Sequence, residues 1–356
     1  MKRAAAIADR VSGLFLKLLA AFNLLFLAAL LATLLLASSQ LRAQEAVACT
    51  GEDLLAQMQR DDPARLERIR AEAATVENGD ALLWRVENLD APTSWLFGTM
   101  PMSDPRVVRL GERAKAAFDA SSAVVIETLD VLDQSKALAA MFTHPELMMF
   151  TDDTTLPSLL PEADRAELEA ALRDRGIALA SVQKMKPWVI AAMVALPACE
   201  LARKAAGAPV LDIRLAEDAG QAGKELGGLE TMVDQLGAMA SLPMDFHVRG
   251  LVDTLRLGDR VDDVIETMIV LYLRGETAMI WPFLNAALPS DEGSQAGYAA
   301  FEERLITARN HTMAERAAPF LDRGGAFVAV GALHLPGPEG LVALLREAGF
   351  KVEAVR

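Results

Sequence analysis

Short apolar runs bounded by glycine, proline and polar residues recur near both ends of the chain. Runs of this length with β-branched or aromatic residues indicate β-strands. The dipeptide Ala91-Pro92 separates the first two runs, which therefore predict a hairpin. Strands are predicted at 81–86, 94–99, 123–127, 225–229, 326–330 and 351–355.

Between these strands the apolar positions follow the period of an amphipathic helix. Several predicted helices end at a glycine, and Pro197 predicts a kink in one of them. Helices are predicted at 52–74, 107–120, 161–175, 188–204, 212–221, 232–240, 244–257, 261–274, 298–323 and 338–348. The order of elements predicts a single α/β domain over 45–356, with a sheet built from N- and C-terminal strands and a large helical insertion.

Residues 18–37 form a run of twenty residues without a charge, preceded by four basic residues. Twenty helical residues span the hydrocarbon core of a bilayer, and the basic flank keeps the N-terminus cytoplasmic. We therefore expect 1–44 to be a signal anchor with a transmembrane helix and the body to lie outside the cytoplasm. A cleaved signal peptide and secretion are the alternative, with Ala46-Val47-Ala48 as the candidate cleavage site. A lipoprotein signal at Cys49 is a further reading.

The whole chain of 356 residues carries 35 basic and 49 acidic residues, a net charge of −14. Residues 1–44 hold five of the basic residues and one acidic residue, so 30 basic and 48 acidic residues remain, a net charge of −18. An acidic body without a basic cluster argues against nucleic acid as a partner. Cys49 and Cys199 could pair in an oxidising compartment or remain as two free thiols.

Chemistry-bearing residues stand at the ends of the predicted strands. Glu127 and Glu230 each end a strand, and a strand runs into Gly331 with His334 three residues later. Because open α/β sheets place their sites at the carboxyl ends of strands, these side chains could converge on a metal or an acid–base pair. The alternative is that the acids are solvated, that Glu230 favours a helix dipole and that His334 is an ordinary turn residue.

Three more residues carry weaker signals. Asp212 precedes a helical run and reads most simply as an N-cap. Arg309 and Asn310 lie inside a predicted helix, where an asparagine is mildly unfavourable and so suggests a specific bond, although a solvated face also explains it.

Several stretches together resemble the TraB/GumN family, which includes the Tiki membrane-tethered metalloproteases. The stretches are SWLFGTMPMSDPRV, VVIET, MKPWVIAAMVALPACELAR, GAPVLDIRLAEDAGQAGKELGGLETMVDQL, LITARNHTMA and FVAVGALHLPGPEGLVALLREAGFKV. The resemblance implies an α/β fold related to erythromycin-esterase-like and haem-uptake proteins. It also implies a manganese or cobalt site built from two Gly-x-x-His motifs, a strand-end glutamate and an Arg-Asn pair.

Carried over to this chain, the resemblance assigns His334 and Glu127 as metal ligands, and these two with Arg309 and Asn310 as catalytic residues. It places five further residues in the substrate cleft: Gly98, Thr99, Gly331, Asp212 and Glu230. The first motif departs from the family, because Pro101 stands where the family has histidine. Proline offers no donor or acceptor side chain, so it cannot bind metal.

Two functions follow as hypotheses. The first is a membrane-tethered, metal-dependent, peptidase-like hydrolase that acts outside the cytoplasm. The second is a pseudoenzyme that binds a peptide or an envelope protein through the same cleft without turnover. Binding of haem or another cofactor is a third hypothesis, and it rests only on the analogy of fold.

Overall fold

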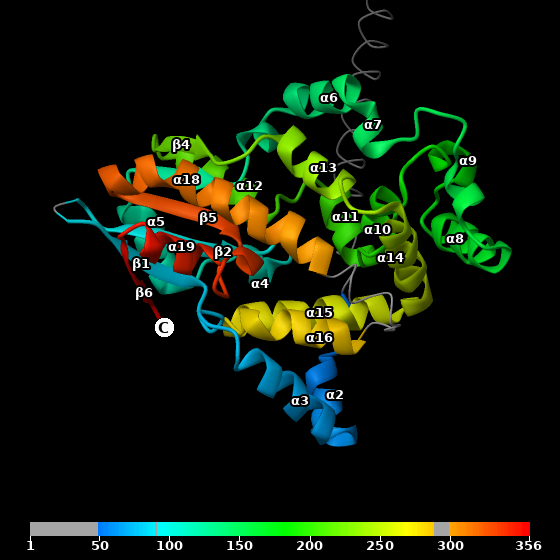
Figure 1. Ribbon diagram of the computed structural model, residues 1–356, viewed down its shortest axis with the longest axis horizontal. Coiled ribbons are helices and arrows are strands. Elements are labelled where there is room, and N and C mark those ends of the chain that lie inside the picture. The colour runs from blue at the N-terminus through cyan, green and yellow to red at the C-terminus, as the bar shows by residue number, and fades with distance from the viewer. Residues whose placement is uncertain (1–48, 90, 288–298) are drawn as a thin grey trace, which may run out of the picture. The chain divides into compact units, whose positions relative to one another are not determined.

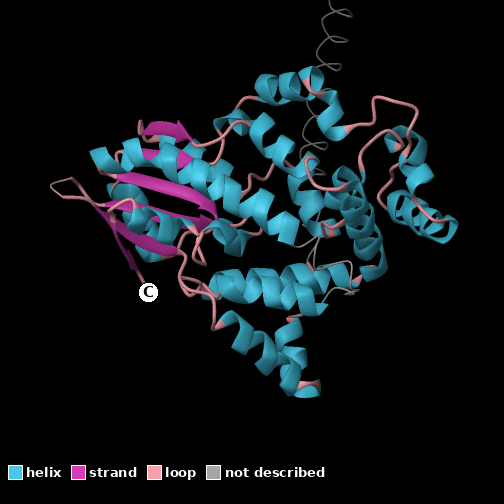
Figure 2. Ribbon diagram, in the orientation of Figure 1, coloured by secondary structure: helices cyan, strands magenta, loops and turns pink. Residues whose placement is uncertain are grey.

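The computed structural model describes residues 49–89, 91–287 and 299–356. A six-stranded sheet occupies one half of this part of the chain, and helices build the other half (Figures 1 and 2). The strands are β1 (Leu83–Glu87), β2 (Ser94–Thr99), β3 (Ala123–Ile126), β4 (Glu225–Gly228), β5 (Ala326–Gly331) and β6 (Lys351–Ala354). The mixed α/β fold agrees with the prediction.

The sheet has the order β4-β3-β5-β2-β1-β6. Strands β4, β3, β5 and β2 run parallel to one another, whereas β1 is antiparallel to both β2 and β6. The predicted hairpin is therefore confirmed, and C-terminal β5 sits between N-terminal β3 and β2. The two C-terminal strands are not neighbours in the sheet, because β2 and β1 lie between them. The parallel arrangement brings the carboxyl ends of four adjacent strands to one edge.

Two apolar layers cover the sheet. On one face Met313, Ala317 and Leu321 of α18 (Ala308–Arg323) pack with α19 (Leu341–Glu347). On the other face α5 (Glu112–Ala120), α12 (Leu211–Gln221) and α15 (Arg260–Arg274) pack around Phe327. Figure 1 shows α18 crossing in front of the sheet. The result is a three-layer sandwich.

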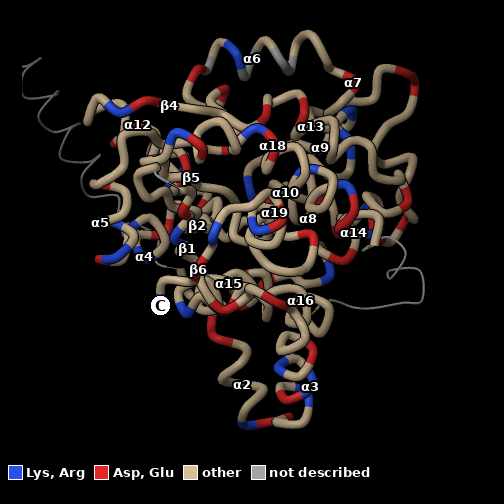
Figure 3. The backbone as a smooth tube through the Cα atoms, turned by 60° about the vertical axis from the view of Figure 1, so that its left-hand side comes forward, with Lys and Arg blue, Asp and Glu red and all other residues tan. Residues whose placement is uncertain are grey.

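Two further apolar clusters lie beyond the sandwich. One joins α2 (Leu54–Asp61), α3 (Pro63–Ala73) and α16 (Ile280–Ala287) to the far side of α15. The other joins α8 (Glu162–Asp174), α9 (Leu179–Val182), α10 (Pro187–Val194) and α14 (Met244–Leu257). Basic and acidic residues are interspersed along α2 and α3 (Figure 3). The remaining helices are α4 (Pro105–Val108), α6 (Gln134–Thr143), α7 (Pro145–Met148), α11 (Ala198–Ala205) and α13 (Met232–Ala240).

Proline and glycine divide three of the predicted helices. Asp62 ends α2 and caps α3, whose first residue is Pro63, so 52–74 is two helices. Likewise Pro197 separates α10 from α11 within 188–204, and Gly111 precedes α5 within 107–120. A proline at the first helical position has no amide hydrogen to contribute to a preceding helix, so it starts a new one.

Cys49 and Cys199 are joined by a disulfide that ties the start of the described chain to α11, with Cα atoms 5.3 Å apart. Among the residues that the structure describes, no helix is long and apolar enough to cross a membrane. The apolar run at 18–37 lies outside these residues.

Candidate functional site

The site forms at the sheet edge where β3, β4 and β5 end. Glu127 follows β3 directly, and Glu230 follows β4 after one further residue. Gly331 is the last residue of β5, and His334 ends the short 3₁₀ turn Ala332–His334. Because β4-β3-β5 is the order of these strands, Glu127 lies between Glu230 and Gly331, as the strand-end argument predicts.

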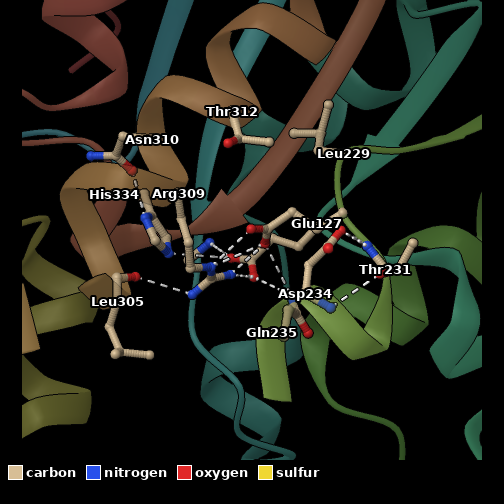
Figure 4. Close-up of polar contacts among 12 residues, drawn as sticks. Glu127, Leu229, Thr231, Asp234, Gln235, Leu305, Arg309, Asn310, Thr312 and His334 are labelled. Atoms are coloured by element: carbon tan, nitrogen blue, oxygen red, sulfur yellow. Dashed lines mark hydrogen bonds and ion pairs between the residues drawn. The ribbon is translucent and has the colours of Figure 1, made fainter. Parts of the chain in front are cut away.

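Arg309 holds the two glutamates together (Figure 4). Its Nη2 lies 2.7 Å from Glu127 Oε2 and 2.6 Å from Glu230 Oε2, and its Nε lies 3.0 Å from Glu230 Oε1. The remaining Nη1 donates to the Leu305 carbonyl at 3.2 Å. Each nitrogen of the guanidinium is thus engaged, and these bonds position Glu127.

The backbone ahead of Arg309 is a π-helix over Glu302–Thr307, which then continues into α18. π-Helical turns are rare and occur mostly as single turns at functional sites. The Leu305 carbonyl that accepts from Arg309 belongs to this turn. The wide turn therefore contributes directly to the placement of the guanidinium.

Glu127 accepts hydrogen bonds on both of its carboxylate oxygens. The Gly331 amide donates to Oε1 at 2.7 Å, while Gln235 Nε2 donates to Oε2 at 2.9 Å alongside Arg309. Burial by itself raises the pKa of this carboxyl, but His334 when it is protonated, and Arg309 and the Gly331 amide at every pH, lower it overall. Glu127 is therefore ionised and fixed in orientation.

His334 is fixed through its other ring nitrogen. Its Nδ1 lies 2.6 Å from Asn310 Oδ1, and the Asn310 amide nitrogen donates to the Glu339 carbonyl at 2.7 Å. This second bond assigns the asparagine oxygen as the acceptor, so His334 Nδ1 carries the hydrogen and Nε2 carries the lone pair. Asn310 thus makes a specific bond, as its place inside a helix suggested, and it orients His334.

His334 Nε2 faces Glu127 Oε1 at 3.8 Å. Burial lowers the pKa of His334 to about 4, with the Arg309 charge adding to this effect and the Glu127 charge opposing it. At neutral pH the imidazole is uncharged. A lone pair and a carboxylate oxygen that face each other repel one another unless a proton or a cation lies between them.

These two donors suit a divalent cation in kind, because imidazole nitrogen and carboxylate oxygen are ligands that transition metals accept. They fall short in number, since catalytic zinc sites keep three protein ligands. Within the described ranges, no group of three or more His, Cys, Asp or Glu side chains could hold a metal ion. His144 and His311 do not supply the missing ligand, because neither lines the cavity around the site.

That cavity has a volume of about 520 Å³, and Thr99, Pro101, Asp212, Gly331 and Tyr272 line it together with Glu127, Arg309 and His334. Pro101, where the resemblance predicts a departure from the family motif, is exposed and lines this cavity. The loop that carries it is held by the Ser103 amide, which donates to the buried Glu200 carboxylate at 2.7 Å. The backbone next to Pro101 is thus fixed in the wall of the cavity that His334 and Glu127 also line.

The pKa of Asp212 is shifted in the opposite direction to that of Glu127. Its Oδ1 accepts from Thr99 Oγ1 at 2.7 Å. Burial raises the pKa of Asp212 to about 6, the charge of Glu127 adds to the rise, and the Thr99 bond opposes it. Because it lies in the first turn of α12, where Val210 is the N-cap residue, Asp212 is not the N-cap that the sequence suggested.

Two of the five predicted cleft residues do not line the cavity. Glu230 is buried behind Arg309, with 2% of its side chain exposed, and Gly98 packs against the turn that follows β5. A Cβ at Gly98 would lie 2.8 Å from Leu335 Cδ1 and 3.0 Å from Ala332 Cα, so only glycine fits there. Thr99, Gly331 and Asp212 do line it.

The sequence reasoning missed Gln235 and Tyr272. Gln235 lies in α13 and donates to Glu127, whereas Tyr272 lies at the end of α15 and donates to the Gly98 carbonyl at 3.0 Å. Neither residue stands at a strand end or in a recognisable motif. An amide or a tyrosine within a helix carries no local signal of what it contacts across the fold.

The model of the TraB/PrgY/gumN family matches residues 82–354. The chain belongs to this family. The match covers every strand of the sheet and all of the residues that form the site in this member of the TraB/PrgY/gumN family.

Three relatives illustrate the similarity. Metalloprotease TIKI2 of Danio rerio is 27% identical over 321 residues, covering 77% of this chain and 61% of the relative. Metalloprotease TIKI1 of Homo sapiens is 26% identical over 77% of this chain and 62% of the relative, and the metalloprotease TIKI homolog of Nematostella vectensis is 25% identical over 79% and 68%. The chain thus spans about three-fifths of the length of the vertebrate relatives. No solved structure matches the chain significantly.

Proposed function

We propose that this protein is a metal-assisted, peptidase-like hydrolase that acts outside the cytoplasm, tethered to the cell membrane through residues 18–37. The observation that carries the proposal is the pair of His334 Nε2 and Glu127 Oε1, which face each other at 3.8 Å. Membership of the family and similarity to proteins named metalloproteases support the same reaction class.

His334 and Glu127 would hold the divalent cation, manganese or cobalt, in a site that water or substrate completes. A cation bound there supplies Lewis-acid polarisation of a carbonyl and lowers the pKa of a bound water. Asn310 keeps Nδ1 of His334 protonated, so that Nε2 stays available as a ligand. Arg309, Gln235 and the Gly331 amide keep Glu127 ionised and oriented.

Asp212 supplies the acid–base function in this proposal. Glu127 and Asp212 line the same cavity, and their environments move their pKa values in opposite directions. Such a separation marks one carboxylate that stays ionised and another that can hold or release a proton near neutral pH. Asp212 is therefore suited to accept a proton from a nucleophile or return it to a leaving amine.

A pseudoenzyme that binds a peptide or an envelope protein is the second candidate. The observation in its favour is Pro101, which leaves the site with two metal donors where the family has a further histidine. Both candidates use the same cavity, so binding of a peptide alone does not separate them.

The test compares peptide hydrolysis and bound metal, measured by elemental analysis, in the purified full chain supplied with manganese or cobalt. The matched pair of variants is Glu127→Gln and Glu339→Gln, because the Glu339 side chain is 54% exposed and its carboxylate pairs with His311, away from Glu127 and His334. We expect metal-dependent cleavage by the wild type and by Glu339→Gln, and none by Glu127→Gln. Stoichiometric binding of metal by the wild type without cleavage would favour the pseudoenzyme. A wild type that neither binds metal nor cleaves peptides would refute the proposed metal site.

A further inference from the structure

The cavity that holds the polar site has a second wall that is almost entirely apolar. Seven aliphatic or methionine side chains that line the cavity are only half-buried, so part of their surface faces it. They come from five different segments of the chain and include Val131, Val210, Ile213, Met268, Ile306 and Leu333. A concave, mainly apolar surface with a few polar groups at one end is the usual form of a ligand site, and 520 Å³ lies within the range of about 300–1,000 Å³.

Three of these side chains are not needed for the packing of the core. Val210, Ile213 and Ile306 belong to none of the four apolar clusters, either as members or as residues packed against them. An apolar side chain that packs in no core gains little from folding. Gathered around one cavity, the three residues provide apolar surface for something that enters it.

Val210 is the clearest case, because it occupies a position where helices prefer a different kind of residue. It is the N-cap of α12, and its side chain makes no capping hydrogen bond. Serine, threonine, aspartate and asparagine are strongly preferred at N-caps, and valine is among the poorest choices. The apolar side chain at this position is thus unfavourable for the helix and complementary to the rest of the wall.

The charged side chains that line the cavity limit which chemical groups it can bind. Arg309 is the one basic residue that lines the described cavity, and its nitrogens are engaged by Glu127, Glu230 and Leu305. An acidic group would meet the carboxylates of Glu127 and Asp212 without a free cation. A basic group would lose its water against the apolar wall and would meet only Asp212, whose ionisation burial disfavours, because Glu127 is already paired with Arg309.

We infer that this wall is the specificity pocket for an aliphatic side chain of a peptide, at the residue next to the amide that the polar end of the cavity cleaves. The inference rests on the proposed function for the position of that amide. The pocket selects leucine, isoleucine, valine or methionine over charged residues. Met100 and Met102 line the cavity beside Met268, and the flexible side chains of the three methionines let the pocket adapt to different aliphatic shapes.

The test measures binding separately from cleavage. The probes are fluorescent pentapeptides that are identical except for leucine, lysine or aspartate at the centre, titrated into the full chain and then assayed for cleavage. Val210→Asp places a carboxylate in the wall at a helix position that favours aspartate, so the fold is retained. Its control is Gly111→Asp, which adds the same residue at the exposed N-cap of α5, outside the cavity, where a new Cβ meets nothing within 4 Å.

We expect the wild type and Gly111→Asp to bind the leucine peptide about tenfold or more tightly than the lysine and aspartate peptides. Val210→Asp should lose most of this preference and gain affinity for the lysine peptide. Equal binding of all three peptides by the wild type, or an unchanged preference in Val210→Asp, overturns the inference even if cleavage occurs. Preference for leucine without cleavage by any protein supports the pocket and contradicts the proposed function.

Discussion

Replacing Asp212 by asparagine should stabilise the protein at neutral pH. The Asp212 carboxyl is largely buried, it accepts a hydrogen bond from the Thr99 hydroxyl, and the charge of Glu127 acts against its ionisation. Burial chiefly raises its pKa from 3.8 to about 6. Ionisation of Asp212 therefore costs more free energy in the native state than in the unfolded chain, and it destabilises the fold. Asparagine keeps an oxygen that can accept from Thr99 and carries no charge.

The magnitude follows from the shift in pKa. A rise from 3.8 to about 6 corresponds to about 3 kcal/mol at pH values where the carboxyl is ionised in both states. Below pH 4 the carboxyl is protonated in both states, so the penalty is absent. Between pH 4 and pH 6 the native state binds the proton more tightly, and the penalty grows as the pH rises. Asp212→Asn should therefore raise the free energy of unfolding by about 3 kcal/mol at pH 7.5 and by little at pH 4.

The assay is urea unfolding of the full chain, followed by tryptophan fluorescence between pH 4 and pH 8. The control is Asp104→Asn, which should behave in the opposite way. Burial raises the pKa of Asp104, but its bonds and ion pairs with Arg106 and Arg203 lower it overall. Its ionised form therefore stabilises the fold above about pH 4, and this stability is lost as the pH falls.

The reasoning is refuted if Asp212→Asn is no more stable than the wild type at pH 7.5, or if its effect is the same at every pH. Under the proposed function the same variant should gain stability and lose peptide cleavage. A site that holds a destabilising group for the sake of its chemistry shows this opposition of stability and activity.

Two further substitutions test the framework of the site. Gly98→Ala should lower the free energy of unfolding by about 1–3 kcal/mol in urea titrations, because the new methyl overlaps Ala332 and Leu335. The control Gly237→Ala lies in a helix interior with no atom within 4 Å, so it should raise the free energy of unfolding by up to about 1 kcal/mol. Equal effects of the two substitutions would contradict the packing around Gly98. Cys199→Ala should lower the free energy of unfolding by up to about 5 kcal/mol, since the disulfide closes a loop with a sequence separation of 150 residues. Equal stability of the variant and the wild type, with no effect of reductant on the wild type, would contradict this.

Local patterns in the sequence were enough to predict the strands and the acids at their ends. Apolar runs locate β3 and β5 within one or two residues, and parallel strands necessarily bring Glu127 and Gly331 to one edge. Pro197 predicted a kink where the structure has a full break between α10 and α11. The apolar period continued across Asp62-Pro63 and concealed the break between α2 and α3.

Residues that act through contacts distant in sequence could not be predicted in the same way. Asn310 contacts His334 across 24 positions, and Gln235 contacts Glu127 across 108. Both lie on helices whose rotation about their own axes is set by packing against distant parts of the fold, α18 against the sheet and α13 against α6, α7 and the π-helix. Gly98 and Glu230 stand at strand ends like the true cavity residues, yet Gly98 serves packing and Glu230 anchors Arg309.

The most direct test of the account is the affinity of the full chain for manganese and cobalt before and after Pro101→His. Pro101 lines the cavity with His334 and Glu127, so a histidine there would add a third donor at the position where the resemblance predicts one. Pro105→His is the control, because Pro105 is exposed at the start of α4 outside this cavity. The account predicts that Pro101→His binds metal at least about tenfold more tightly than the wild type and cleaves peptides faster, with no change in Pro105→His. Equal affinity and activity in all three proteins would contradict a metal site at His334 and Glu127.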